Sequence, residues 1–271
     1  IDGRVFAGLF NSAEDGAYPN RTLDVSDARL RFTFSPSPNI VAVSRLNLVG
    51  LNKASSNSID YLYVDLLNWG GSLPGHNLRV GKFKIDVGEE TYQDNPVENL
   101  LITTSVAAVS GYDEGVNFRG PATFLPGSLY SLAVYNGTKG LETSASGLAY
   151  SAKLAAAPQR NLYFSASYFD TGKLVKRDNT VAGTDIKIAN LTDAPTGATA
   201  WSRRLWEVDA RWNYGATGVK APFGDADVPF QLAAAYGQFT DDAVGASDRD
   251  GNFWCVEGLY NVTPKLYLAA R

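Results

Sequence analysis

The segment RLWEVDARWNYG (204–215) carries two kinds of side chain in strict alternation. One parity is aromatic and aliphatic and the other is charged or polar: Trp206, Val208, Ala210, Trp212 and Tyr214 against Glu207, Asp209, Arg211 and Asn213. Successive side chains of a strand point to opposite faces, so the segment predicts a strand with one apolar and one polar face. A soluble sheet with one buried face and a membrane β-barrel both fit this pattern.

Composition favours β-structure and excludes several kinds of function. The 271 residues include 26 Gly, 14 Tyr and 13 Phe but no Met, and only 19% are charged, which favours short strands and turns. With one cysteine, Cys255, and one histidine, His76, we expect no internal disulfide, no Cys/His metal cluster and no cofactor. A formal charge of −4 offers no basic field, so we expect no nucleic-acid partner. The apolar run 100–109 is too short for a membrane helix, which needs roughly 18 residues.

Segments with period-2 alternation recur along the whole chain and predict an all-β protein of about thirteen strands. The predicted strands are 3–10, 25–34, 40–49, 58–67, 77–84, 115–119, 128–135, 147–155, 161–169, 204–214, 229–238, 252–260 and 264–271. No helical period and no Pro/Ser-rich linker interrupts them. We therefore predict a single domain over 1–271.

The connectors between these strands fall into two groups by order. Those after even-numbered strands are mostly short and often contain Pro: 35–39, 68–77, 120–127, 157–161, 215–228 and 261–264. Those after odd-numbered strands are mostly longer and polar: 11–24, 50–57, 85–114, 136–146, 170–203 and 239–251. A membrane barrel has turns at one end and loops at the other, whereas a Greek-key sandwich has no reason to sort connectors in this way. The connectors therefore predict an antiparallel up-and-down transmembrane β-barrel.

The strand count predicts more chain than the sequence contains. Barrels built from one bacterial chain have an even number of strands, and an unpaired strand in lipid leaves backbone groups without hydrogen bonds. The strand 264–271 is the thirteenth. We therefore expect the native polypeptide to continue beyond Arg271, to about sixteen strands in all.

The segment IDYLYVDLLNWGGSLPGHNLRVGKFKIDVG (59–88) resembles the outer-membrane porins of the phosphate-selective porin O and P type. In those proteins a strand ending in YVDL is followed by a short turn and by LRVGRFK, before a large third loop. The resemblance implies a homotrimeric barrel in the bacterial outer membrane, in contact with the lipid bilayer and outer-leaflet lipid. It also implies passage of small solutes or ions, and no enzymatic activity. Asp86 stands where the family has Pro, and no dense basic ladder is visible, so phosphate preference is not implied.

The predicted third loop, 85–114, is long and acidic. It contains seven acids and no Lys or Arg: Asp86, Glu89, Glu90, Asp94, Glu98, Asp113 and Glu114. The strands before it carry a set of cations that we call the basic wall: Arg29, Arg31, Arg45, Arg79, Lys82 and Lys84. In porins this loop folds into the barrel and narrows it. An acidic loop facing a basic wall would create a transverse field that favours small polar solutes.

Further residues are predicted to face the lumen from their parity: Glu207, Asp209 and Arg211, and also Lys153. The alternative for the acidic loop is that its carboxylates only solvate an outer surface. Two other functions stay open. One is a plugged or partner-filled barrel with a structural or adhesive role, and the other is a soluble all-β carbohydrate-binding domain.

Two weaker patterns predict no chemistry. Residues 248–252, DRDGN, resemble the start of a calcium loop, but Leu259 occupies the closing position where such loops have Glu, so we expect a solvated loop. His76 lies in a predicted turn, and nothing in the sequence joins it to a Ser and an Asp as a catalytic triad.

Overall fold

The computed structural model describes residues 1–10, 22–49, 59–89, 111–125, 127–137, 147–159, 161–177, 180–181, 194–215, 228–263 and 266–271. The strands are β1 (Asp2–Phe10), β2 (Thr22–Ser37), β3 (Ile40–Asn47), β4 (Ile59–Leu66), β5 (Asn77–Lys84), β6 (Tyr112–Pro121), β7 (Ser128–Tyr135), β8 (Ala149–Gln159), β9 (Leu162–Asp170), β10 (Leu174–Arg177), β11 (Thr180–Val181), β12 (Ala200–Tyr214), β13 (Phe230–Val244), β14 (Arg249–Thr263) and β15 (Leu266–Ala270). A short 3-10 helix, η2 (Leu67–Gly71), lies between β4 and β5.

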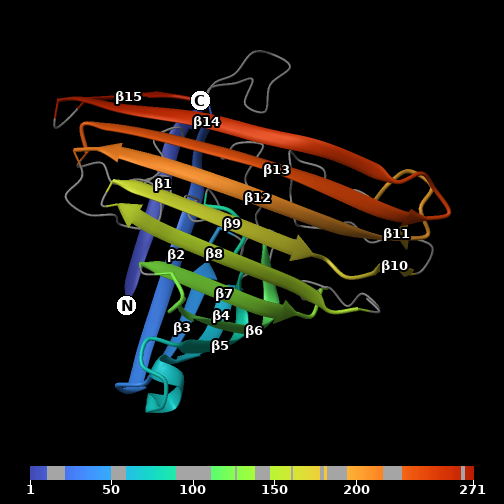
Figure 1. Cartoon of the computed structure of the whole chain (residues 1–271), viewed down its shortest axis with the longest axis horizontal. Coiled ribbons are helices and arrows are strands. Elements are labelled where there is room, and N and C mark those ends of the chain that lie inside the picture. The colour runs from blue at the N-terminus through green and yellow to red at the C-terminus, as the bar shows by residue number, and fades with distance from the viewer. Residues whose placement is uncertain are drawn as a thin grey trace.

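The strands form one antiparallel sheet in which neighbours in sequence are neighbours in space. Thirteen strands follow a single path, β1 to β9 and then β12 to β15, while β10 pairs with β11 and β12. Figure 1 shows β7, β8, β9, β12, β13 and β14 running side by side, with β1 to β5 crossing behind them at a steep angle, so the sheet curls around an interior. Within the described residues the sheet is open, because β1 pairs with β2 and β15 with β14. The predicted all-β, up-and-down barrel architecture is confirmed.

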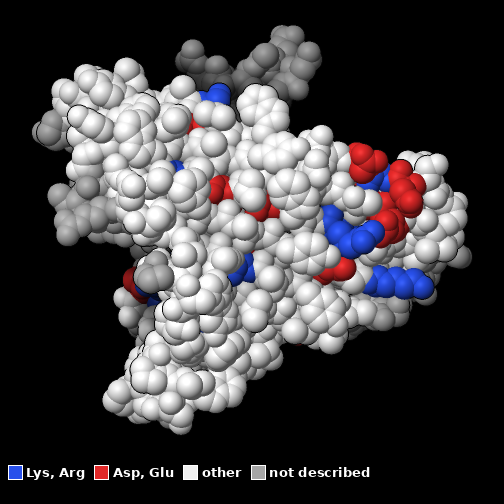
Figure 2. All heavy atoms as spheres, viewed as in Figure 1, with Lys and Arg blue, Asp and Glu red and all other residues white. Residues whose placement is uncertain are grey.

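The two faces of the sheet differ in the way that the alternation predicted. On β12 the side chains of Trp206, Val208 and Trp212 are 38–42% exposed on the outer face, whereas Glu207 and Arg211 are each 1% exposed on the inner face. Figure 2 shows a mostly uncharged surface over the middle of β8 to β13, with charges gathered toward the end where β10 and β11 lie. An exposed apolar surface of this extent marks contact with a membrane or another protein.

No helix among the described residues is long and apolar enough to cross a membrane.

Several strands extend further than the sequence predicted. β14 begins at Arg249, so most of the segment 248–252 is part of a strand, and the solvated loop predicted for it was wrong there. This is the segment that resembles the start of a calcium loop, and the described residues contain no group of three or more His, Cys, Asp or Glu side chains that could hold a metal ion. β6 begins at Tyr112, so Asp113 and Glu114 belong to this strand and not to the third loop. Polar residues at strand ends resemble loop residues in sequence, which is why the predicted strands were too short.

The inner face carries a hydrophobic core toward the long-loop end of the barrel. It combines Ile85 and Val87 of the third loop with side chains of β5, β7, β8, β9, β12, β13 and β14: Phe83, Ala133, Tyr135, Ala149, Phe169, Leu205, Phe239 and Phe253. Ile85 and Val87 are 1% and 0% exposed. Burying an aliphatic side chain of this size contributes roughly 1.5–3 kcal/mol, so this core holds the first part of the loop against the inner wall.

Candidate functional site

The third loop leaves β5 and turns into the barrel interior. The backbone N–H of Ile85 donates to the carbonyl oxygen of Gly111 at 3.0 Å, which closes the base of the loop. Ile85 and Val87 then pack into the hydrophobic core, while Asp86 between them stays partly exposed. The alternation of apolar and acidic residues thus places the apolar side chains against the wall and leaves the Asp86 carboxylate in the interior.

Gly88 brings the loop backbone against the inner face of β9 and β12. Its N–H donates to Ser167 Oγ at 3.1 Å. Its φ is +65°, and a Cβ at this position would lie 2.6 Å from both carboxylate oxygens of Glu207. Only glycine avoids both the backbone strain and the collision at this point of closest approach.

Replacing Gly88 by Ala is therefore expected to weaken the docking of the loop and to lower the free energy of unfolding by about 1–3 kcal/mol. The matched control is Gly258→Ala, because no atom lies within 4 Å of a Cβ built on Gly258. Chemical denaturation of both variants in detergent measures the difference. Equal unfolding midpoints for the two variants would show that Gly88 is not held against Glu207.

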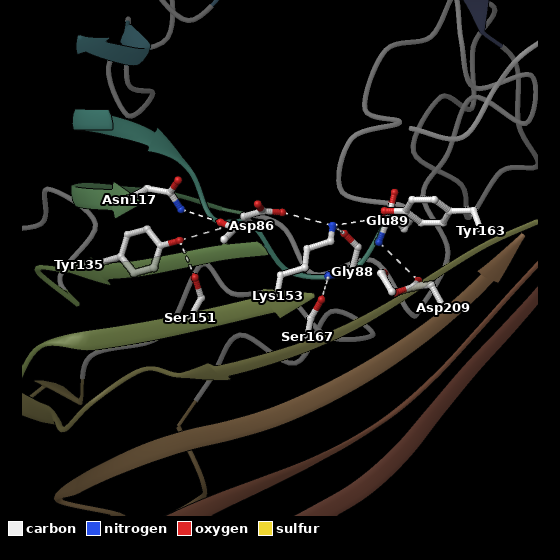
Figure 3. A network of polar contacts seen from close by, with 12 residues as sticks. Asp86, Gly88, Glu89, Asn117, Tyr135, Ser151, Lys153, Tyr163, Ser167 and Asp209 are labelled. Atoms are coloured by element: carbon white, nitrogen blue, oxygen red, sulfur yellow. Dashed lines mark hydrogen bonds and ion pairs between the residues drawn. The ribbon is translucent and has the colours of Figure 1, made fainter. Parts of the chain in front are cut away.

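Lys153 of β8 clamps the described end of the loop, as Figure 3 shows. Its Nζ lies 3.2 Å from an Asp86 carboxylate oxygen and 2.7 Å from Glu89 Oε1, and it donates to the carbonyl oxygen of Gly88 at 2.8 Å. The side chain of Lys153 is only 7% exposed. Charge-assisted hydrogen bonds of this kind are among the strongest in proteins, so one ammonium group holds the loop at three of its residues.

Glu89 continues the contact between the loop and the opposite strands. Its carboxylate accepts a hydrogen bond from the hydroxyl of Tyr163 on β9 at 2.5 Å. Its backbone N–H donates to Asp209 Oδ1 on β12 at 3.4 Å, and the second oxygen of Asp209 accepts from Ser165 Oγ at 2.9 Å. Arg211 places its guanidinium carbon 5.1 Å from the ring centre of Tyr163. The loop therefore ends in a buried polar network.

The structure places Glu207, Asp209, Arg211 and Lys153 on the inner face, the side to which their parity assigned them. All four are 8% exposed or less. The loop contacts two of them directly, because Gly88 lies against Glu207 and the backbone N–H of Glu89 donates to Asp209. That they line a pore stays a prediction.

Arg79 of the predicted basic wall faces the interior but is paired with an acid. Its Nε and Nη2 each lie 2.8 Å from a different carboxylate oxygen of Asp65 on β4, and its guanidinium stacks 3.7 Å from the ring centre of Tyr63. Arg119 of β6 makes a single contact with the same carboxylate, Nη2 to Oδ2, at 3.2 Å. This part of the wall thus carries two guanidinium groups around one carboxylate.

Three more members of the wall also meet acids. Arg29 and Arg45 lie 3.4 and 2.9 Å from an oxygen of Asp60, and Arg45 also donates to the hydroxyl of Tyr112. A β-bulge makes this possible, because Arg45 pairs with Tyr61 while the next residue, Leu46, pairs with Ile59, leaving Asp60 as the extra residue. Arg31 lies 2.8 Å from Asp2 near the end of β1 and is about half exposed.

Lys82 does not belong to this wall, which corrects the sequence prediction. Lys82 pairs in register with Leu62 and Glu114, and both of these neighbours are exposed on the outer face. Lys84 pairs in register with Tyr112, whose hydroxyl accepts from Arg45, so its place in the wall stays a prediction. Glu90, Asp94 and Glu98 of the predicted loop lie outside the described residues.

A cavity of about 380 Å³ lies between the loop and the short-turn end of the barrel. Its lining mixes charged, polar and apolar residues: Gly75, Asn77, Asp86, Glu89, Arg119, Gly120, Leu129, Tyr130, Ser131, Lys153, Ala155 and Tyr163. Asp86 and Glu89 therefore border the same space as Arg119. The volume falls at the lower end of the range for small-molecule sites.

Comparison with known proteins identifies the architecture. No protein-family model matches the chain, and no curated protein sequence matches it. Among solved structures the chain is similar to the anion-selective porin from Comamonas acidovorans, with a TM-score of 0.52 and 16% identity over 89% of this chain and 67% of that one. The chain has the porin fold. At this identity the similarity extends to the fold alone. It supports a porin-like barrel but does not support the narrower phosphate-selective O and P type.

Within the porin fold, sequence reasoning missed four residues that complete the site. Asp60, Asp65, Arg119 and Tyr163 supply the partners of the wall and of Glu89. Asp65 had a usable signal, because it shares parity with Tyr61 and Tyr63 on a strand next to Arg79. Asp60 had none, because period-2 alternation places it on the outer face with Leu62 and Val64.

Proposed function

We propose that this protein is an outer-membrane porin, a passive diffusion channel for small hydrophilic solutes or ions through an interior narrowed by the third loop. The observation that carries the proposal is the path of residues 85–89. This segment leaves the wall at β5 and contacts β8, β9 and β12 on the inner face. A loop that crosses the interior reduces its cross-section at that level.

The outer surface supports a location in the bacterial outer membrane. The exposed positions of neighbouring strands carry large apolar side chains, among them Leu132, Phe164, Tyr168, Leu232 and Trp254, which are 40–67% exposed. Lipid-facing strands of outer-membrane barrels show this alternation of apolar outward and polar inward residues. The same surface on a protein in water would promote aggregation.

The charges inside favour passage of small polar solutes. Asp86 and Glu89 lie on the loop side of the cavity, and Arg119 lies on its wall. Opposite charges across a narrow passage orient polar solutes and exclude apolar ones more strongly than the same charges in open water, because the low-dielectric protein concentrates the field. The transverse field is thus proposed to act between Asp86 and Glu89 on one side and Arg119 on the other, and Arg119 is not part of the basic wall that the sequence predicted.

A plugged barrel is the second candidate, favoured by the hydrophobic core inside the long-loop end. Phe83, Phe169, Phe239 and Phe253 are at most 7% exposed there, together with Ile85 and Val87 of the loop. A packed apolar core occupies interior space that a wide channel would leave to water. The two candidates differ in whether a continuous aqueous path bypasses this core.

Planar-bilayer recordings of the purified protein test the proposal. We expect stepwise current increments in KCl, each corresponding to the insertion of one channel unit, and swelling of protein-containing liposomes in an uncharged small sugar. A barrel that inserts, as shown by detergent extraction and β-type circular dichroism, but conducts no ions would favour the plugged candidate. A monodisperse protein in the absence of detergent would contradict the membrane barrel itself.

A further inference from the structure

Two groups of opposite excess charge reach the cavity beneath the loop, one through Arg119 and the other through Asp86, Glu89 and Lys153. One contains Arg79 and Arg119 around Asp65, and the other contains Asp86 and Glu89 around Lys153. We call them the arginine pole and the carboxylate pole. Each pole holds two charges of one sign against one of the other, so the cavity has a positive and a negative end.

Arg119 is the accessible cation of the arginine pole. The fork of Arg79 occupies both oxygens of Asp65, so Arg119 reaches only one of them, at 3.2 Å. The side chain of Arg119 is 34% exposed and lines the cavity, whereas that of Arg79 is 16% exposed. A guanidinium presents five donors in a planar fork, so one contact leaves donors available for a carboxylate in the cavity.

Asp86 and Glu89 are the anions of the carboxylate pole. Both contact the same ammonium group of Lys153, whose third described acceptor is the carbonyl oxygen of Gly88. Both Lys153 and Asp86 line the cavity, but the side chain of Lys153 is 7% exposed and that of Asp86 is 17% exposed. An approaching ammonium group therefore meets carboxylate oxygen at this end, because the lysine charge is enclosed by its own acceptors.

We propose that the cavity is a binding site for small zwitterions, solutes that carry a carboxylate and an ammonium group on a short aliphatic chain. The proposal rests on the channel function argued above and names its preferred solute class. The carboxylate binds Arg119 and the ammonium group binds Asp86, while the more buried Glu89 adds to the negative potential at that end. The volume of about 380 Å³ suits a solute of this size, and Leu129 and Ala155 in the lining contact its aliphatic part.

The test compares three probes of similar length by their block of KCl current: 4-aminobutyrate, butyrate and butylammonium. We expect half-block by 4-aminobutyrate at a concentration about tenfold or more below that of either singly charged probe, because each charged end adds a charge-assisted hydrogen bond. Equal block by butyrate would overturn the proposal in favour of a simple anion site. Equal block by butylammonium would overturn it in favour of a cation site.

Variants assign the effect to the arginine pole. Arg119→Gln should weaken the block by 4-aminobutyrate about tenfold while leaving the block by butylammonium within about twofold, and Arg119→Lys should recover part of the loss. Arg204→Gln is the matched control, because Arg204 is half exposed and pairs with Asp242 away from the cavity. Unchanged zwitterion block in Arg119→Gln would overturn the site.

The channel function is measured separately on the same preparations. KCl conductance and sugar-driven swelling of liposomes depend on an open barrel and not on zwitterion binding. If the protein conducts ions but 4-aminobutyrate blocks no better than the singly charged probes, the zwitterion site is contradicted and the channel function is still supported. Absence of both signals in the unmodified protein removes the channel function and the inference together. The comparison of the three probes on the unmodified protein decides the case even if an Arg119 variant fails to fold.

Discussion

Replacing Asp241 by Asn is expected to lower the free energy of unfolding by about 3–5 kcal/mol, the usual loss when one partner of a buried ion pair is removed. Asp241 accepts hydrogen bonds from Arg203 Nε at 2.6 Å and Nη2 at 2.9 Å, and both side chains are fully buried. Arg249 adds a third contact at 2.7 Å. The neutral amide would leave the Arg203 guanidinium buried beside Trp201 and Phe239 without its counter-charge.

The adjacent residue provides the control. Asp242 pairs with Arg204 at 2.6 Å, but these side chains are 43% and 50% exposed, so Asp242→Asn should cost no more than about 1 kcal/mol. Urea or guanidinium unfolding in detergent micelles, followed by tryptophan fluorescence, measures both variants. Similar losses for the two would mean that solvent reaches the Arg203–Asp241 pair and that its burial does not govern its contribution.

The order and faces of the strands were predictable because alternation is a local property. The segment 204–214 showed its two faces directly, and β12 has them as predicted. Its first residues were missed, because Ala200 to Arg203 follow a polar connector and their inward partners lie on other strands. Trp201 packs with Leu174 and Ala198, and Arg203 with Asp241. Such contacts depend on strand register, which no local pattern encodes.

The site was harder to predict than the fold, because one residue of shift reverses a face. The bulge at Asp60 turns an acid toward Arg29 and Arg45 that regular alternation assigns to the outside. Lys82 shows the opposite case. It was grouped with the arginines by charge and nearness in sequence, but its pairing with Leu62 and Glu114 puts it on the outer face.

The acidic character of the third loop could be predicted from the sequence, but the residue that pairs with its acids could not. The sequence predicted an acidic loop inside the barrel, facing the basic wall that precedes it in the chain. The ion pairs described for Asp86 and Glu89 are instead with Lys153, which follows them by more than sixty residues. A loop that crosses a barrel contacts strands far away in sequence, so neighbouring charges in the chain are poor guides to its partners.

Replacing Lys153 by Gln is expected to shift ion selectivity strongly toward cations, with the cation-to-anion permeability ratio rising about threefold or more. The change removes the ammonium group between Asp86 and Glu89 and leaves their negative charges facing the cavity. It also removes the donor to the Gly88 carbonyl oxygen, so the loop should fluctuate and the current should become noisier. Reversal potentials in a KCl gradient and single-channel noise measure the two effects.

Lys82→Gln is the control that distinguishes the effect of removing a charge inside the barrel from the effect of removing any one positive charge. Both variants lower the net charge by one unit, but Lys82 lies on the outer face, so the wall of the sheet separates its charge from the interior. Its reversal potential should stay close to that of the unmodified protein. If Lys82→Gln changes the selectivity as much as Lys153→Gln, the field in the passage depends on total charge, and the loop with its lysine does not form the constriction. If Lys153→Gln alone changes it, the narrowest part of the ion path lies beside residues 86–89.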